Sequence, residues 1–144
     1  MRSDAMVSTT EKLICTNCHS DGDPGLKTAA EIKSQFDDLE TRIARSKDIL
    51  DRAAESGMEV GQAQLDLIQA TDALTQARVA VHSFRAAKVA QEVEPGKAVT
   101  EKTYQAGVRA LHERNYRRVG LSISLLVVGA TLLGLKLWIS EIER

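Results

Sequence analysis

Hydrophobic residues recur at three- and four-residue steps along the first three quarters of the chain, a spacing typical of helices that bury one face. The first such stretch runs from residue 28 to residue 56. Its periodic apolar positions are Ile32, Phe36, Leu39, Ile43, Leu50 and Ala53. Charged residues fall between them, so the pattern predicts an amphipathic helix. Ser56-Gly57 is the predicted stop, because glycine tolerates the left-handed conformation that ends many helices.

A second stripe, from Val60 to Val93, predicts another helix. Its apolar positions are Leu67, Ile68, Ala70, Leu74, Ala77, Val81 and Phe84. Pro95-Gly96 is expected to break it, because proline lacks an amide proton and clashes with the preceding turn. A third helix is predicted from about Ala98, with Tyr104, Val108 and Leu111 along one side. Short connections between long amphipathic helices favour antiparallel neighbours. The sequence therefore predicts an all-α fold, a long antiparallel hairpin or three-helix bundle over residues 28–118.

The last quarter of the chain is strongly apolar. Residues 119–135 carry no charge, and residues 137–139 extend the apolar length to 21 positions, enough to cross a bilayer core of roughly 30 Å. Arginines and Tyr116 flank one end and Trp138 the other, as interface anchors do. The alternative is a buried core helix, but the rest of the chain has too little apolar surface to cover such a helix. We therefore predict a transmembrane helix over residues 119–139 and a short tail over 140–144.

Composition narrows the classes of protein further. The chain has 19 Lys+Arg against 20 Asp+Glu, a net charge of -1, which gives no reason to expect nucleic acid. Aromatic residues make up 3% and there are two prolines, which argues against a β-sandwich or barrel. No signal peptide is recognisable at the start. No Gly-rich phosphate loop or nucleophile–base arrangement appears, so we do not expect an enzyme.

Cys15-Thr16-Asn17-Cys18-His19 is the one chemically sharp motif. Two thiols at this spacing can add to the two vinyl groups of haem, and the adjoining histidine can ligate the iron. A thioredoxin-type pair would need a βαβ surround, and zinc would need two more ligands. A chance occurrence is the remaining alternative. We predict that residues 1–27 are a haem c attachment segment, with Cys15 and Cys18 as thioether partners and His19 as the proximal ligand.

A second axial ligand is sought among His82, His112 and Met58. At ~1.5 Å per helical residue, His82 lies ~10–15 Å from the predicted turn at Pro95 and is the best-placed candidate. His112 lies about 20 Å up the third helix, and Met58 roughly 40 Å away at the far end of the first. The structural alternatives are a half-buried His82 and a solvated His112. Either histidine could instead ligate a haem carried by another chain.

The membrane topology contains a conflict. Haem c is attached outside the cytoplasm, so the part before the apolar segment is expected to face the periplasm. Arg109, Arg114, Arg117 and Arg118 precede that segment and only Lys136 and Arg144 follow its charge-free part, which favours the opposite orientation. Because the charge rule is weak when only one short tail follows the helix, we base the predicted orientation, with the bundle in the periplasm, on the haem chemistry.

Three features of the chain belong together: the motif at residues 15–19, the stretch Ala77–His82, and Arg117–Leu121, which opens a terminal apolar helix. In this combination the chain resembles the C-terminal part of membrane-anchored multihaem c-type cytochromes, of the cytochrome c nitrite-reductase-like and cytochrome c3-like group. In that group the histidine after the second cysteine is the proximal ligand, which corresponds to His19. A histidine on a following helix often serves as distal ligand, which corresponds to His82. This sequence departs from the group in having one haem motif and no export signal, which suggests a C-terminal fragment or split partner of a larger cytochrome.

The predicted function is electron transfer by one covalently bound haem c, held on the periplasmic side of a membrane by a single C-terminal helix. The expected partners are membrane lipid and other haem proteins or redox subunits, in a homo- or hetero-oligomeric complex. The rival prediction is a tail-anchored helical interaction protein without haem.

Overall fold

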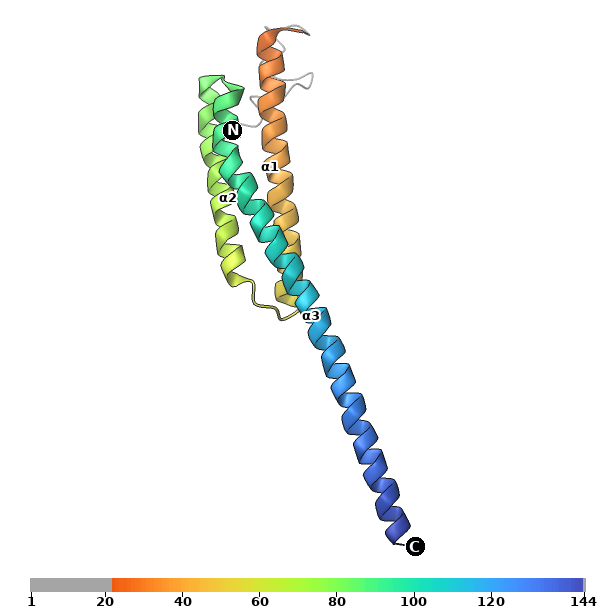
Figure 1. Cartoon of the computed structure of the whole chain (residues 1–144). Helices are drawn as coiled ribbons and strands as arrows, with labels where there is room; N and C mark the ends of the chain where they lie inside the picture. Colours follow the sequence, from red (N-terminus) through yellow and green to blue (C-terminus); the bar gives the residue numbers. More distant parts are fainter. Residues whose placement is uncertain (1–21, 144) are drawn as a thin grey trace.

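The structure is a computed structural model that describes residues 22–143. Within this range every regular element is a helix: α1 (Pro24–Glu55), α2 (Gly61–Ala80), a 3-10 turn η3 (Val81–Ser83) and α3 (Ala86–Ile142). Figure 1 shows α1, α2 and the first half of α3 side by side, with α2 antiparallel to the other two and the second half of α3 projecting alone. The predicted all-α class, with a bundle and an apolar C-terminal helix, is confirmed.

The buried residues of α1 and α3 follow alternating steps of four and three, the repeat of a coiled-coil seam. On α1 they are Ile32, Phe36, Leu39, Ser46, Leu50 and Ala53, with the partly buried Ile43 filling the gap in the repeat. On α3 they are Val89, Val93, Gly96, Thr100, Thr103, Gly107 and Ala110. The apolar face predicted for the first helix is thus confirmed, and α3 continues the same repeat with smaller side chains.

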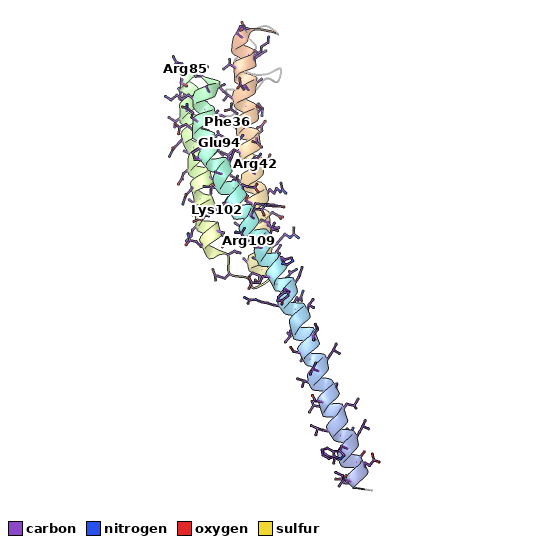
Figure 2. All side chains as sticks on the ribbon, viewed as in Figure 1. Phe36, Arg42, Arg85, Glu94, Lys102 and Arg109 are labelled. Atoms are coloured by element: carbon purple, nitrogen blue, oxygen red, sulfur yellow. The ribbon has the colours of Figure 1, made fainter. Side chains whose placement is uncertain are left out.

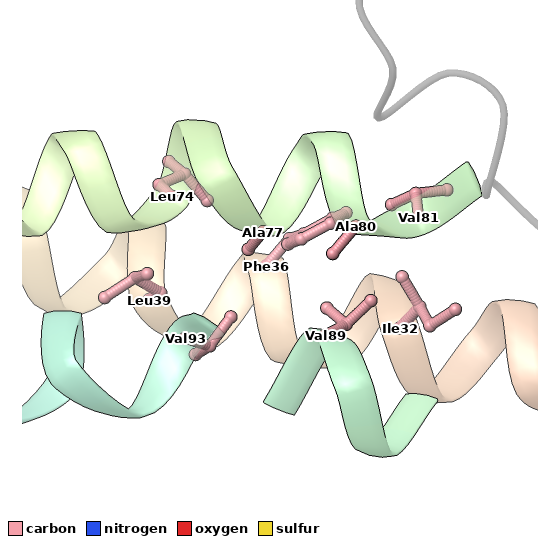
Figure 3. Packing of buried hydrophobic residues seen from close by; sticks show 9 residues of the cluster. All are labelled: Ile32, Phe36, Leu39, Leu74, Ala77, Ala80, Val81, Val89 and Val93. Carbon is pink, nitrogen blue, oxygen red and sulfur yellow. The ribbon is translucent and has the colours of Figure 1, made fainter. Parts of the chain in front are cut away.

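Two apolar clusters fill the bundle. The distal cluster, farther from the apolar half of α3, is shown in Figure 3 and consists of Ile32, Phe36, Leu39, Leu74, Ala77, Ala80, Val81, Val89 and Val93. The proximal cluster consists of Leu50, Ala53, Val60, Leu67, Ala70 and Ala110. Each large side chain that is fully buried contributes about 1.5–3 kcal/mol to stability.

Small residues bring α3 close to α1 at two points. A Cβ added to Gly107 would lie 2.8 Å from Ile49 Cγ2, and one added to Gly96 would lie 3.1 Å from Leu39 Cδ2. Ser46 Oγ donates a buried hydrogen bond of 2.8 Å to the Thr100 carbonyl oxygen. The contact between these helices is therefore set by glycine and hydroxyl side chains as well as by large apolar ones.

The chain reverses at residues 81–85, and the predicted break at Pro95 is wrong. α3 runs through Pro95, which is exposed, and its buried repeat continues from Val93 to Gly96 across the proline. A proline inside a helix costs about 3 kcal/mol. Because Pro95 is exposed, water can bond the carbonyl that it leaves without a partner, and the packing of α3 against the bundle outweighs the cost. The predicted second helix consequently ends at Ala80, and the predicted third helix begins at Ala86.

The sequence also mispredicted which side chains of α2 and α3 are buried. Phe84 and Ile68, expected on the buried stripe, are 76% and 55% exposed. On α3, Val108 is exposed, and Tyr104 and Leu111 are half-buried, because the side that faces the bundle is the one carrying Thr103, Gly107 and Ala110. The α3 face was therefore mispredicted. The cause is that its buried residues are small or hydroxylated and do not form an apolar stripe.

α1 ends where the sequence predicts. Gly57 has φ +78°, its N–H donates to the Ala54 carbonyl, and the Met58 N–H donates to the Ala53 carbonyl. This is the Schellman arrangement, in which a glycine in the left-handed conformation lets its own amide and the next one cap the helix. The loop that follows carries the chain into α2 at Gly61.

α3 has 57 residues and is about 86 Å long at the usual helical rise. In the part of the chain that the structure describes, it is the one helix long and apolar enough to cross a membrane, and its apolar window is entirely unburied. Figure 2 shows the side chains of this half standing away from the helix with no other element beside them. No break separates the bundle from the apolar half, since the helix continues past Ala110, its last buried residue.

Candidate functional site

Cys15, Cys18 and His19 lie outside the described residues. The structure begins just beyond them, with a well-defined start of α1. Asp23 is the N-cap residue, and its Oδ1 accepts a hydrogen bond of 2.7 Å from the Gly25 N–H. Pro24 occupies the first helical position, where its missing N–H has no cost. The start of the helix is thus fixed four positions after His19.

His82 lies in the η3 turn at the same end of the bundle as the start of α1 (Figure 1). The neighbouring Val81 is buried in the distal cluster together with Ile32 of α1. The His82 side chain is exposed and lines an open hollow of about 460 Å³. The other residues lining that hollow are Gln76, Val79, Ala80, Ser83, Lys88 and Glu92. The alternative of a half-buried structural histidine is therefore wrong, and the His82 imidazole is accessible from outside the bundle.

The turn next to His82 is strained. Phe84 has φ 50°, a left-handed conformation that is uncommon for a bulky residue. Its N–H donates to the Val81 carbonyl at 2.8 Å, and Ser83 Oγ donates to the Ala80 carbonyl at 2.7 Å. The Phe84 ring gains little from burial, because the residue is 76% exposed. The distal end therefore presents an accessible histidine and an exposed aromatic ring on one tight turn.

His112 and Met58 lie toward the opposite end of the bundle. His112 is exposed on α3, 26 residues beyond Ala86, or about 39 Å along the helix. The shorter distance expected from the sequence is wrong, because it was measured from a turn at Pro95. Met58 is partly buried against the proximal cluster. Of the three candidate second ligands, His82 alone shares the end of the bundle at which α1 begins.

No group of three or more His, Cys, Asp or Glu side chains that could hold a metal ion occurs within residues 22–143. The acidic side chains there mostly serve the bundle. Ion pairs between helices join Lys97 to Asp38 at 2.7 Å and Lys102 to Asp66 at 2.8 Å. A hydrogen bond from the Lys97 ammonium is the main cause that lowers the pKa of the Asp38 carboxyl, and a hydrogen bond from Arg42 of α1 lowers it further.

Further cross-links fix the register of the helices. Arg78 of α2 pairs with Glu40 of α1 at 2.6 Å. Arg45 of α1 donates a hydrogen bond of 2.8 Å to the Tyr104 hydroxyl, and its guanidinium carbon lies 4.0 Å from the centre of that ring. These contacts lie on the bundle surface, where each contributes a modest amount to stability. Their residues are thus accounted for by the fold.

The sequence reasoning missed an arginine-lined pocket at the base of the bundle. It lies between the α1–α2 loop and the part of α3 just before the apolar segment. The signal was present in the spacing of Arg114, Arg117, Arg118 and Leu121, which are three, four and seven positions apart and therefore share one helix face. The sequence alone predicts these arginines only as charges that flank a membrane helix.

No family model, curated protein or solved structure matches the chain.

Proposed function

We propose that this chain is an electron-transfer c-type cytochrome, a subunit or a fragment of one, with one haem c at the distal end of a helical stalk. The observation that carries the proposal is the Cys15–His19 motif, which precedes α1 by four residues in the sequence. The η3 turn that carries His82 packs against this first part of α1, through Val81 and Ile32. The chain is not proposed to be a catalyst. The proposal also draws on the resemblance of the sequence to membrane-anchored multihaem cytochromes.

Chain length supports the pairing of His19 with His82. His19 and Asp23 are four positions apart in the sequence, and four residues of any conformation span at most about 14 Å. The motif is therefore tethered close to the end of the bundle where η3 lies. His112 is about 39 Å farther along α3 and is the weaker candidate ligand.

The residues at the distal end fit a haem edge. Cys15 and Cys18 would form the thioether links, His19 would be the proximal ligand, and His82 would be the distal ligand. His82 is exposed beside an open hollow, and Val79 and Phe84 offer apolar surface, being 68% and 76% exposed. Haem c supplies one-electron transfer when it is bound.

The stalk sets the distance between the proposed haem end and the membrane. From Ala86 to Val119 is 33 residues of continuous helix, or about 50 Å. We propose that the apolar part of α3 spans the membrane and that the bundle faces the periplasm, where haem c is attached. At this height the haem would meet other haem proteins or redox subunits of a membrane complex, and quinol in the bilayer would be out of reach.

Replacing both cysteines tests the cofactor. The chain is produced in a host with working cytochrome maturation machinery, and the membrane fraction is examined for the reduced α-band and for covalent haem by mass. We expect one covalent haem in the wild type and none in the C15S/C18S variant. A colourless wild-type protein from that host contradicts the proposal.

Replacing the histidines tests the distal ligand. His82→Ala is compared with His112→Ala, a matched change at another exposed histidine. We expect both variants to keep covalent haem, and only His82→Ala to change the axial-ligand signature in electron paramagnetic resonance and the reduction potential. An unchanged signature in His82→Ala removes His82 from the site and leaves the cysteine attachment standing.

A second candidate function is a tail-anchored interaction protein without haem. The excess of arginine before the apolar segment favours it, because that excess favours a cytoplasmic bundle. An apolar hollow of about 290 Å³ between α1 and α2, lined in part by Ile43, Leu67 and Ile68, gives such a protein a surface for a partner. The C15S/C18S variant separates the two functions. If the chain is an interaction protein, the wild type has no chromophore and the variant assembles with its partners as the wild type does.

A further inference from the structure

The base of the bundle carries an open pocket of about 550 Å³. One wall is the end of α1 and the loop after it, over residues 55–58. The other wall is the face of α3 that carries Arg114, Arg117, Arg118 and Leu121. The pocket therefore lies where the bundle meets the apolar half of α3.

The pocket is positively charged. Its lining contains three arginines and one acidic residue, Glu55. Arg114 is half-buried, and its guanidinium donates a hydrogen bond of 2.7 Å to Ser56 Oγ, which holds it against the loop. Arg117 pairs with Glu113 on its own helix. Arg118 is exposed and forms no ion pair within residues 22–143, so its charge is available to a ligand.

The walls of the pocket are amphipathic. Leu121 is 62% exposed on the pocket side of α3, and Met58 lines the opposite wall. One turn farther along, α3 has no charged residue until Lys136. A ligand that fills this pocket must therefore offer an anionic group to the arginines and an apolar part alongside Leu121.

We propose that the pocket binds the phosphate headgroup of an anionic phospholipid. Arg117 and Arg118 would contact the phosphate oxygens, since guanidinium groups match phosphate in a bidentate geometry. Arg114 would position the α1–α2 loop beside them through Ser56. The acyl chains would run along the apolar side chains that begin at Val119. This inference rests on the membrane-anchor part of the proposed function and does not depend on haem.

The position of the pocket favours a lipid over a soluble anion. It is at the first turn before the charge-free segment, which is the level of the headgroups if that segment spans a bilayer. An exposed ion pair between a guanidinium and a phosphate contributes up to about 1 kcal/mol, equivalent to about fivefold in affinity. Two such arginines together give up to roughly 25-fold.

The test uses the full-length chain in detergent, titrated with phosphatidylglycerol or phosphatidylcholine and followed by native mass spectrometry. The variant is R117Q/R118Q. The control is Arg109→Gln, which removes one positive charge from an exposed site on α3 outside the pocket. We expect the wild type and the control to prefer phosphatidylglycerol, and the double variant to bind it up to roughly 25-fold more weakly.

Two outcomes overturn the headgroup site: equal phosphatidylglycerol affinity in the double variant and the control, or displacement of the lipid by inorganic phosphate at equal concentration. Insertion is measured separately in vesicles of phosphatidylcholine containing phosphatidylglycerol, using quenching of the single tryptophan, Trp138, by brominated acyl chains. If the wild type inserts and shows no lipid preference, only the headgroup site is wrong. If it does not insert, the proposed anchor is wrong as well.

Discussion

The chain contains two phenylalanines, and the structure places them in opposite environments at the same end of the bundle. Phe36 is 2% exposed in the distal cluster, whereas Phe84 is 76% exposed in the turn after η3. Phe36→Ala removes a buried ring and leaves a cavity, which costs about 3–5 kcal/mol. Phe84→Gly removes little buried surface and relieves the left-handed backbone at φ 50°, a gain of about 1 kcal/mol.

Thermal unfolding of the full chain in detergent, followed by far-UV circular dichroism, measures both effects. For a bundle of this size 1 kcal/mol corresponds to about 4–8 °C in Tm. Phe36→Ala is therefore expected to lower the Tm of the bundle by about 12 °C or more, and Phe84→Gly to raise it by about 4–8 °C. Phe84→Ala is the matched control for Phe36→Ala and is expected to change little.

The comparison also tests where the chain reverses. If the second helix continued to Val93 and broke at Pro95, Phe84 would lie on its buried stripe. Phe84→Ala would then cost as much as Phe36→Ala, and Phe84→Gly would cost more still, because glycine weakens a helix interior. Either result would refute a turn at residues 81–85.

Three other predictions follow from the packing and charges of α3. Pro95→Ala should stabilise the bundle by up to about 3 kcal/mol in denaturant unfolding, because alanine suits a continuous helix; destabilisation would contradict the continuous α3. Gly107→Val should destabilise it by about 1–3 kcal/mol, since the added carbons meet Ile49, and an unchanged midpoint would show that α1 and α3 are farther apart. The Lys102 hydrogen bond lowers the pKa of Asp66, so the stability from this pair is present above the unfolded carboxyl pKa and is lost as the pH falls through the lower folded value. Lys102→Gln should raise the pKa of Asp66 in an NMR titration, and an unchanged value would exclude the pair.

The sequence predicted α1 and its end well because the information there is local. Large apolar residues from Ile32 to Leu50 repeat at helical steps, and Gly57 supplies the capping conformation. The apolar half of α3 was equally readable, because a long run without charge has few other meanings. Both signals depend on residue type alone and need no knowledge of a neighbouring helix.

The turn between α2 and α3 could not be read in this way. Residues 81–85 contain no glycine or proline, and the reversal depends on the distal cluster burying Val81 and Val89 from either side of it. Pro95 gave a strong local signal that tertiary packing overrode. The same failure misplaced His112 and underestimated how far it lies from His82. It left unaffected the choice of His82, which is at the end of the bundle in the structure.

The arginine pocket escaped prediction for a related reason. Half of its lining comes from the end of α1 and the loop after it, and nothing in the sequence says that this loop lies beside Arg114 rather than elsewhere. Only the parallel course of α1 and α3 brings Ser56 within 2.7 Å of that guanidinium. Helix periodicity shows which residues share a face, and the fold decides what that face meets.

Because α3 is uninterrupted, the helical bundle and the apolar segment are expected to tilt together. If the apolar segment spans a bilayer as proposed, any tilt of that segment also tilts the whole bundle, because one helix runs from the η3 turn into the segment. Single helices lean by about 20° on average, which would swing a tip about 50 Å away sideways by roughly 17 Å. Its height above the lipid would fall by only about 3 Å. The far end of the bundle could thus move widely parallel to the membrane while its distance from the membrane stays nearly constant. This motion suits contact with neighbouring proteins that extend equally far from the bilayer.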